Sequence, residues 1–225
     1  EIGANGDVTV ISGPTLTNAQ TRAPIAQPAS PPRADVAGRL QSAAQAHALS
    51  PDLVNAVAWA ESRFNDHARS PAGAIGVMQL MPATARVTAT RFKASFDFAK
   101  LTDDASYNAQ IGSAHLGDLL NDWRGSYILV IASYNAGSHN VKKWVEAYGD
   151  PRNPNVDPID WIERIPFTET RNYVQRVMEN LQVYRTRLTP GAPLQIDADL
   201  RRSGVSAIAR TTTVAGDPPA VLGPR

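Results

Sequence analysis

A single glutamate, Glu61, is the residue of this chain best placed for acid–base chemistry. Leu53, Val57 and Glu61 recur every four residues, so in a helix the Glu61 carboxylate lies on the row of apolar side chains. An inward carboxyl group loses solvation, and its pKa rises. Such a group can be protonated near neutral pH and act as a general acid. The alternative is a glutamate near a helix end that only borders the core.

The segment Gly73-Ala74-Ile75-Gly76-Val77-Met78-Gln79-Leu80-Met81-Pro82 can fold back over Glu61, because its glycines permit tight turns. The Gln79 amide can orient a polar ligand through hydrogen bonds without adding charge. Glycosidases of both stereochemical classes use two carboxylates. Asp66 and Glu163 are the nearest spare carboxylates, but neither has a position that obliges it to face Glu61. A site with one carboxylate must find its nucleophile elsewhere.

Helices are expected to position these groups. Ser50-Pro51-Asp52 predicts a helix start, with Ser as the cap, Pro in the first turn and Asp favoured by the helix dipole. The apolar run 127–132 is short enough for a strand, but its neighbours favour a buried helix. Gly137 and Gly149 stand where helix C-caps would be, and Ser138 can cap the helix between them. Further helical runs are expected around Val36–His47, from Pro82, over Ile111–Leu120 and over Val174–Leu188.

Composition indicates one domain with flexible ends. The chain has 225 residues, 43% of them hydrophobic, which is enough for one core. Prolines among small polar residues predict a flexible linker over 1–33 and a flexible tail over 190–225, which leaves 34–189 as the folded domain. The expected fold is mostly α, with at most a short β-hairpin around 74–81.

Several functional classes are disfavoured. The net charge of +1 gives no electrostatic case for nucleic acid. Cysteine is absent, and the four histidines form no zinc-binding pattern, so neither a metal nor another cofactor is expected. No apolar run has the length of a membrane helix, and the chain begins at Glu1 without a basic and apolar leader. We therefore interpret the chain as a mature or excised segment.

Two more segments complete a family pattern. Ala132-Ser133-Tyr134-Asn135-Ala136-Gly137 and Glu163-Arg164-Ile165-Pro166-Phe167-Thr168-Glu169-Thr170-Arg171-Asn172-Tyr173-Val174 follow the Glu61-Ser62 and Gly-Met-Gln-Leu-Met-Pro motifs in order. Over about residues 35 to 188 the chain resembles the catalytic domain of bacterial soluble lytic transglycosylases. These are lysozyme-like enzymes that cleave peptidoglycan, so the resemblance implies a lysozyme-like fold. One departure is Ser133, where the family usually has Ala.

The resemblance also implies roles for individual residues. Glu61 matches the catalytic acid and base of the family. The residues that match substrate-binding positions are Ser62 next to the acid, Ser70, Met78 and Gln79 in the sugar groove, Tyr134 and Asn135 beside the acid, and Glu163 and Tyr173 on the far wall. Some have simpler alternatives: Ser62 could fray its helix, Ser70 could be a turn residue, Met78 could fill the core and Asn135 could belong to a cap.

The implied reaction needs no second carboxylate. Glu61 would protonate the glycosidic oxygen between N-acetylmuramic acid and N-acetylglucosamine and then take the proton of the C6 hydroxyl, which closes a 1,6-anhydro ring. The alternatives are a hydrolytic lysozyme of the goose type and a non-catalytic module for peptidoglycan binding or secretion-machine assembly. The expected partners are peptidoglycan strands, with other cell-wall or secretion-system proteins left open, and the expected location is the periplasm or cell envelope.

Overall fold

The structure, a computed structural model, describes residues 32–203. Within this range the chain is mostly helical, as predicted, and its only β structure is two isolated antiparallel bridges, Arg69 with Ile75 and Ile75 with Leu80. The helices are α1 (Ala34–Ala46), α2 (Pro51–Ser62), α3 (Pro82–Arg91), α4 (Phe98–Asp103), α5 (Ala105–Asp122), α6 (Tyr127–Ala136), α7 (Ser138–Tyr148), α8 (Pro158–Glu163), α9 (Thr168–Leu188) and α10 (Ile196–Leu200).

The helix ends follow the sequence signals in part. Gly137 and Gly149 end α6 and α7 with φ angles of 81° and 86°, which a residue without a Cβ adopts easily. Ser50 occupies the N-cap position of α2, but its side chain makes no capping hydrogen bond. The prediction that Ser138 caps α7 is wrong, because Gly137 takes that position and Ser138 is the first helical residue.

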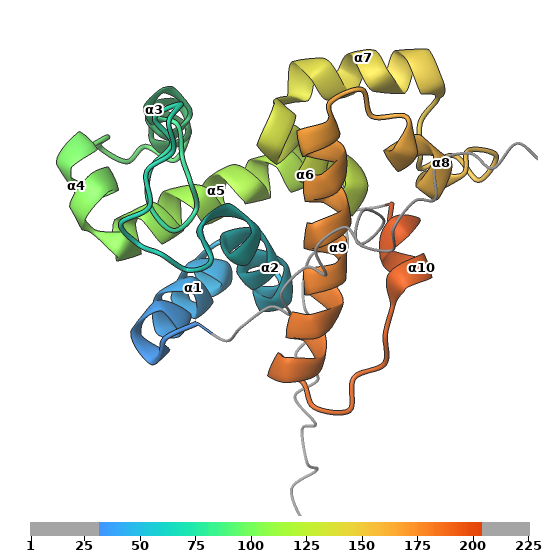
Figure 1. The fold of residues 1–225 in the computed structure, drawn as a ribbon. Helices are drawn as coiled ribbons and strands as arrows, with labels where there is room; N and C mark the ends of the chain where they lie inside the picture. Colours follow the sequence, from blue (N-terminus) through green and yellow to red (C-terminus); the bar gives the residue numbers. More distant parts are fainter. Residues whose placement is uncertain (1–31, 204–225) are drawn as a thin grey trace, which may run out of the picture.

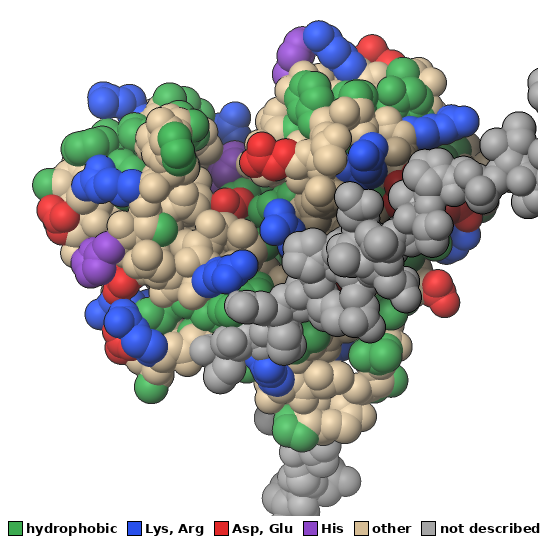
Figure 2. Space-filling model, in the orientation of Figure 1, with side chains coloured by type: hydrophobic (Ala, Val, Ile, Leu, Met, Phe, Trp, Pro, Cys, Tyr) green, Lys and Arg blue, Asp and Glu red, His purple; other side chains and the backbone are tan. Residues whose placement is uncertain are grey.

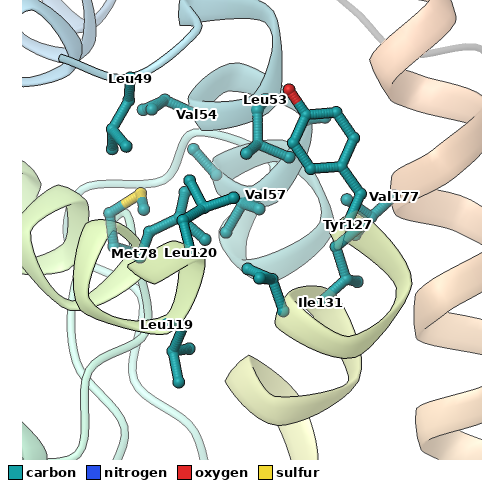
Figure 3. Packing of buried hydrophobic residues seen from close by; sticks show 14 of the residues in the cluster. Leu49, Leu53, Val54, Val57, Met78, Leu119, Leu120, Tyr127, Ile131 and Val177 are labelled. Carbon is teal, nitrogen blue, oxygen red and sulfur yellow. The ribbon is translucent and has the colours of Figure 1, made fainter. Parts of the chain in front are cut away.

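The core lies where α2, α5, α6 and α9 meet. α9 packs along α2 and α6, while α5 packs against α1, α3, α4 and α6. Figure 3 shows side chains of α2, α5, α6 and α9 converging, with Leu53 and Val57 near Tyr127, Ile131 and Val177. All six residues at 127–132 are buried, which explains why a helix with no polar face forms there. The expectation of a buried helix is confirmed.

The elements form two groups around this core. In Figure 1, α3, α4 and the 63–81 loop lie on one side, and α6 to α9 lie on the other. The carboxyl end of α2 points between the two groups, and α9 runs alongside α2. Glu61 therefore stands at the end of α2, where the chain leaves the helix for the 63–81 loop.

The predicted tail begins too early. Residues 190–203, expected to be flexible, include α10, which packs against α6 and α9. Asp199 of α10 is only 2% exposed. The short helix lacks a long apolar period, so the sequence pattern gave no sign of it. The remainder of the predicted tail, 204–225, and nearly all of the predicted linker lie outside the described residues.

Candidate active site

Glu61 meets Tyr173 between α2 and α9. Glu61 stands in the last turn of α2, partly buried, and Tyr173 lies one turn into α9 with 3% of its surface exposed. The Tyr173 hydroxyl donates a hydrogen bond of 2.7 Å to Glu61 Oε1. A phenol that donates to a carboxylate fixes its orientation and leaves Oε2 as the other available oxygen. The predicted inward position of Glu61 is confirmed.

Burial makes this carboxyl group a proton donor at neutral pH. Desolvation raises the pKa of Glu61 from 4.5 to about 7, against the opposing hydrogen bond from Tyr173. The Glu169 carboxylate raises it further, and the Arg176 guanidinium lowers it. Near pH 7 the group is therefore divided between its acid and its base form. Because one group must first donate and then accept a proton in the expected reaction, this balance suits it.

The 75–80 segment is pinned over the end of α2 by side chains that bind its backbone. The Asn108 amide of α5 donates to the Ile75 carbonyl at 2.9 Å and accepts from the Met78 N–H at 3.0 Å. Gly76 lies so close to this amide that an added Cβ would be 2.2 Å from Asn108 Nδ2, and its φ of 78° also requires glycine. The amide and the glycine together bring the segment into place.

Two of the predicted site residues hold the same segment. The Tyr134 hydroxyl of α6 donates to the Met78 carbonyl at 2.9 Å, and the Ser62 hydroxyl donates to the Val77 carbonyl at 2.8 Å. Ser62 is thus held at the end of α2 and does not fray it. Burial raises the pKa of Tyr134, and the negative charge of Glu61 raises it further, so this phenol interacts electrostatically with the carboxylate. Glu61, Ser62, Tyr134 and Tyr173 therefore form one cluster.

Gln79 and Met78 both make contacts within the protein. The Gln79 amide donates to the carbonyls of Ala68 and Gly76, at 3.1 and 2.9 Å, which supports its left-handed backbone with φ of 44°. Its carbonyl oxygen keeps acceptor capacity for a ligand. Met78 is 0% exposed and packs on Gly112, where an added Cβ would be 2.5 Å from Met78 Cβ. This burial favours core packing over sugar contact for Met78.

The other predicted residues make hydrogen bonds with groups other than Glu61. Asn135 Oδ1 accepts a 2.6 Å hydrogen bond from the Thr170 hydroxyl of α9, so it joins α6 to α9. Ser70 is a turn residue whose hydroxyl accepts from the Ala74 N–H at 2.9 Å.

Glu163 is exposed on α8 and accepts from Gln175 at 2.7 Å. Asp66 pairs with Arg33 at 3.1 Å. Neither spare carboxylate named from the sequence acts on Glu61.

Three contributing residues were missed by the sequence analysis. Asn108 lies in the middle of α5, and only its contact with a segment distant in sequence shows its role. Glu169 and Arg176 change the Glu61 pKa from α9. Both stand within a turn of Tyr173, at spacings of four and three residues, so the helical period around that tyrosine was a usable signal.

The site opens on a hollow surface. In Figure 2 the molecule is hollowed between the side of α3 and the side of α7 and α9, and acidic and histidine side chains are seen in the hollow. His115 lies beside the site, since its ring centroid is 5.3 Å from that of Tyr134. Among the described residues, no three His, Asp or Glu side chains are grouped as metal ligands would be, and no helix is long and apolar enough to span a membrane.

Comparison with known families gives two matches. The model of the transglycosylase SLT domain matches residues 39–156, which is more than half of the chain. The model of the soluble lytic transglycosylase helical domain matches residues 164–191. The first match contains Glu61, Gln79, Tyr134 and Asn135, and the second contains Tyr173. Both sides of the Glu61–Tyr173 contact thus fall in matched segments.

Individual relatives agree with these matches. The soluble lytic murein transglycosylase of Salmonella typhimurium is 32% identical over 157 residues, which are 68% of this chain and 23% of that protein. The lytic transglycosylase Slt of Pseudomonas aeruginosa, solved as an inactive Glu-to-Gln mutant, has a TM-score of 0.63 with 32% identity, over 70% of this chain and 25% of that one. The 70-kDa soluble lytic transglycosylase of Escherichia coli has a TM-score of 0.64 with 28% identity, over 72% of this chain and 26% of that one.

These likenesses confirm the predicted lysozyme-like, mostly α fold class. The chain spans only about a quarter of the length of the relatives it matches.

Proposed function

Because the chain belongs to the transglycosylase SLT domain family, we propose that it is a lytic transglycosylase of peptidoglycan. The substrate is the β-1,4 bond between N-acetylmuramic acid and N-acetylglucosamine, and the place of action is the cell envelope. The observation that carries the proposal is the Glu61 carboxyl group, whose pKa of about 7 lets one residue serve as both acid and base. Tyr173 orients this group at 2.7 Å.

The reaction proceeds in two proton transfers. Protonated Glu61 donates to the glycosidic oxygen as the bond to C1 of N-acetylmuramic acid breaks, and positive charge develops at C1. The Glu61 carboxylate then removes the proton of the C6 hydroxyl of the same sugar, whose oxygen bonds to C1. The products are a free 4-hydroxyl on N-acetylglucosamine and a 1,6-anhydro N-acetylmuramic end, and Glu61 regains its proton. The C6 hydroxyl is tethered to C1, which gives it a high effective concentration.

Product analysis tests this proposal. Isolated peptidoglycan is digested in water enriched in ¹⁸O, and the masses of the muropeptides are measured by mass spectrometry. We expect N-acetylmuramic ends that are lighter than hydrolysis products by one water and carry no label. The matched control is Glu61→Gln, which keeps the size and hydrogen bonding of the side chain but should lower turnover at least about 100-fold, the range of acid–base catalysis. Near-parental activity in that variant would remove Glu61 from the mechanism.

One observation favours hydrolysis as a second candidate. Glu169 acts electrostatically on Glu61, and it lies four residues before Tyr173 on the same face of α9. A carboxylate near the acid could orient water instead of leaving the C6 hydroxyl to react. Labelled, reducing muramic ends as the main product would establish this candidate. If Glu169→Gln then no longer incorporated ¹⁸O while the control Glu163→Gln still did, Glu169 would be identified as the second carboxylate.

A further inference from the structure

A buried charged cluster lies at the opposite end of α2 and α9 from the active site. The guanidinium of Arg185, on α9, lies 3.3 Å from Asp52 of α2 and 2.6 Å from Asp199 of α10. The three side chains are 11%, 14% and 3% exposed. Gln182 completes the cluster, because its amide donates to Asp199 at 2.8 Å and its carbonyl oxygen accepts from Arg185 at 3.0 Å.

The cluster and the active site are the two ends of one antiparallel helix pair. Asp52 opens α2 and Glu61 closes it, while Tyr173 lies near the start of α9 and Arg185 near its end. At about 1.5 Å per residue, the polar contacts are separated by about 14 Å along α2 and about 18 Å along α9. Between them the two helices share an apolar interface that includes Leu53, Val57 and Val177 (Figure 3). A polar contact therefore ties each end of a packed pair.

Directional polar contacts define the register of the two helices more sharply than their apolar interface alone. Apolar contacts have no preferred direction, whereas a guanidinium held by two carboxylates has a fixed planar geometry. The hydrogen bond between Tyr173 and Glu61 keeps good geometry only within a few tenths of an ångström. Because packed interiors transmit small displacements, a change at Asp52 and Arg185 reaches the other end of the pair.

We propose that Arg185 is a positioning residue, which sets the register of α2 against α9 by joining Asp52 to Asp199 and so aligns Glu61 with Tyr173. This inference rests on the proposed function, since Glu61 is the catalytic residue that it positions. It also assigns a role to α10, which supplies the second carboxylate to Arg185 and so belongs to the catalytic unit.

The pH profile of activity reports on this alignment. The charged and titratable groups that act on Glu61 are Tyr173, Glu169 and Arg176, all from α9, and Glu61 in turn acts on Tyr134 of α6. Of these, Tyr173 stabilises the carboxylate by a direct hydrogen bond. A looser bond raises the Glu61 pKa, so the pH above which kcat/KM falls moves upward. A loss of stability alone lowers the melting temperature without moving this limb.

The experiment measures kcat/KM against pH on peptidoglycan for three variants. Arg185→Met breaks both ion pairs, and Asp52→Ala breaks only the link to α2, so it remains informative if Arg185→Met does not fold. We expect the alkaline limb to move up by about 0.5 pH unit in both, a fraction of one charged hydrogen bond. Arg185→Lys keeps the positive charge but lacks the planar guanidinium, so it should move the alkaline limb less than Arg185→Met does. The matched control is Arg152→Met, which breaks a partly buried pair with Asp150 in the segment between α7 and α8 and should leave the alkaline limb in place.

A double-mutant cycle separates positioning from general destabilisation. In a Tyr173→Phe background the hydrogen bond is absent, so Arg185→Met should cause no additional shift of the limb. The proposal would be overturned if the alkaline limb of kcat/KM stayed at the parental pH in both Asp52→Ala and Arg185→Met. It would also be overturned if Arg185→Met moved the limb equally in the parental and the Tyr173→Phe backgrounds. Either result leaves the proposed function intact if Glu61→Gln is inactive, so the two failures are distinguishable.

Discussion

The buried carboxyl group of Glu61 should make the protein less stable at alkaline pH, and Glu61→Gln should remove this penalty. The folded state holds the Glu61 proton up to a pKa of about 7, whereas the unfolded chain releases it near 4.5. The stability due to the protonated group is fully present below pH 4.5 and is lost as the pH rises through about 7. Glutamine resembles the protonated group at every pH, because it is neutral and of the same size.

The size of the effect follows from the two pKa values. The difference between about 7 and 4.5, at about 1.4 kcal/mol per pH unit, corresponds to about 3 kcal/mol for ionising Glu61 in the folded state. At pH 8.5 we therefore expect Glu61→Gln to be more stable than the parent by up to about 3 kcal/mol, and at pH 4 by close to nothing. For a domain of this size this is roughly 6–12 °C in melting temperature at the higher pH.

Thermal melts followed by circular dichroism at pH 4 and pH 8.5 measure this difference. The control is Glu179→Gln, which makes the same change at an exposed position of α9 and should shift the melt by the same small amount at both pH values. A gain for Glu61→Gln that is equal at both pH values would refute the link to ionisation. A loss of stability at pH 8.5 would show that the carboxylate is favourably held, contrary to the desolvation argument.

Three further perturbations have definite expected results. Tyr173→Phe should raise the alkaline limit of activity by about 1 pH unit or more, since Glu61 loses a charged hydrogen bond of about 1.5–3 kcal/mol, and a pH profile of kcat/KM measures this. Gly76→Ala should destabilise the fold by at least about 2 kcal/mol in urea titrations, and by more than Gly73→Ala. Alanine is strained by the positive φ at both positions, but only at Gly76 does its Cβ collide with a side chain, that of Asn108. A fragment that ends at residue 189 should melt at a lower temperature than one that ends at 203, because Arg185 loses the buried partner that α10 provides.

Local patterns predicted the elements that carry the acid. The four-residue spacing of Leu53, Val57 and Glu61 is enough to place the carboxylate inward, because helical periodicity determines which side chains share a face. The buried helix α6 was also predicted, although its residues lack an amphipathic period, from the glycine that ends it. These inferences needed only neighbours in sequence.

Contacts between distant segments could not be predicted in this way. Ser62 and Tyr134 were assigned to the site by resemblance, yet their hydroxyls bind the backbone of the 75–80 segment, which no periodicity indicates. Asn108 was missed for the same reason. Asp199 was missed because one short helix offers too little apolar pattern, and its burial depends on an arginine from α9. Polar groups of this kind are placed by the assembled fold, since their partners exist only after the helices have packed.

The tight seating of Met78 on Gly112 has a consequence for chemical durability. Oxidation of a methionine adds an oxygen to the sulfur and turns an apolar side chain into a polar one, which disrupts a packed core. Met78 is 0% exposed and Met178 is 7% exposed, whereas Met81 is 42% exposed. An oxidant therefore meets Met81 first, at a surface position where a sulfoxide can be hydrated. The thioether that supports the segment beside Glu61 stays out of reach as long as the protein is folded.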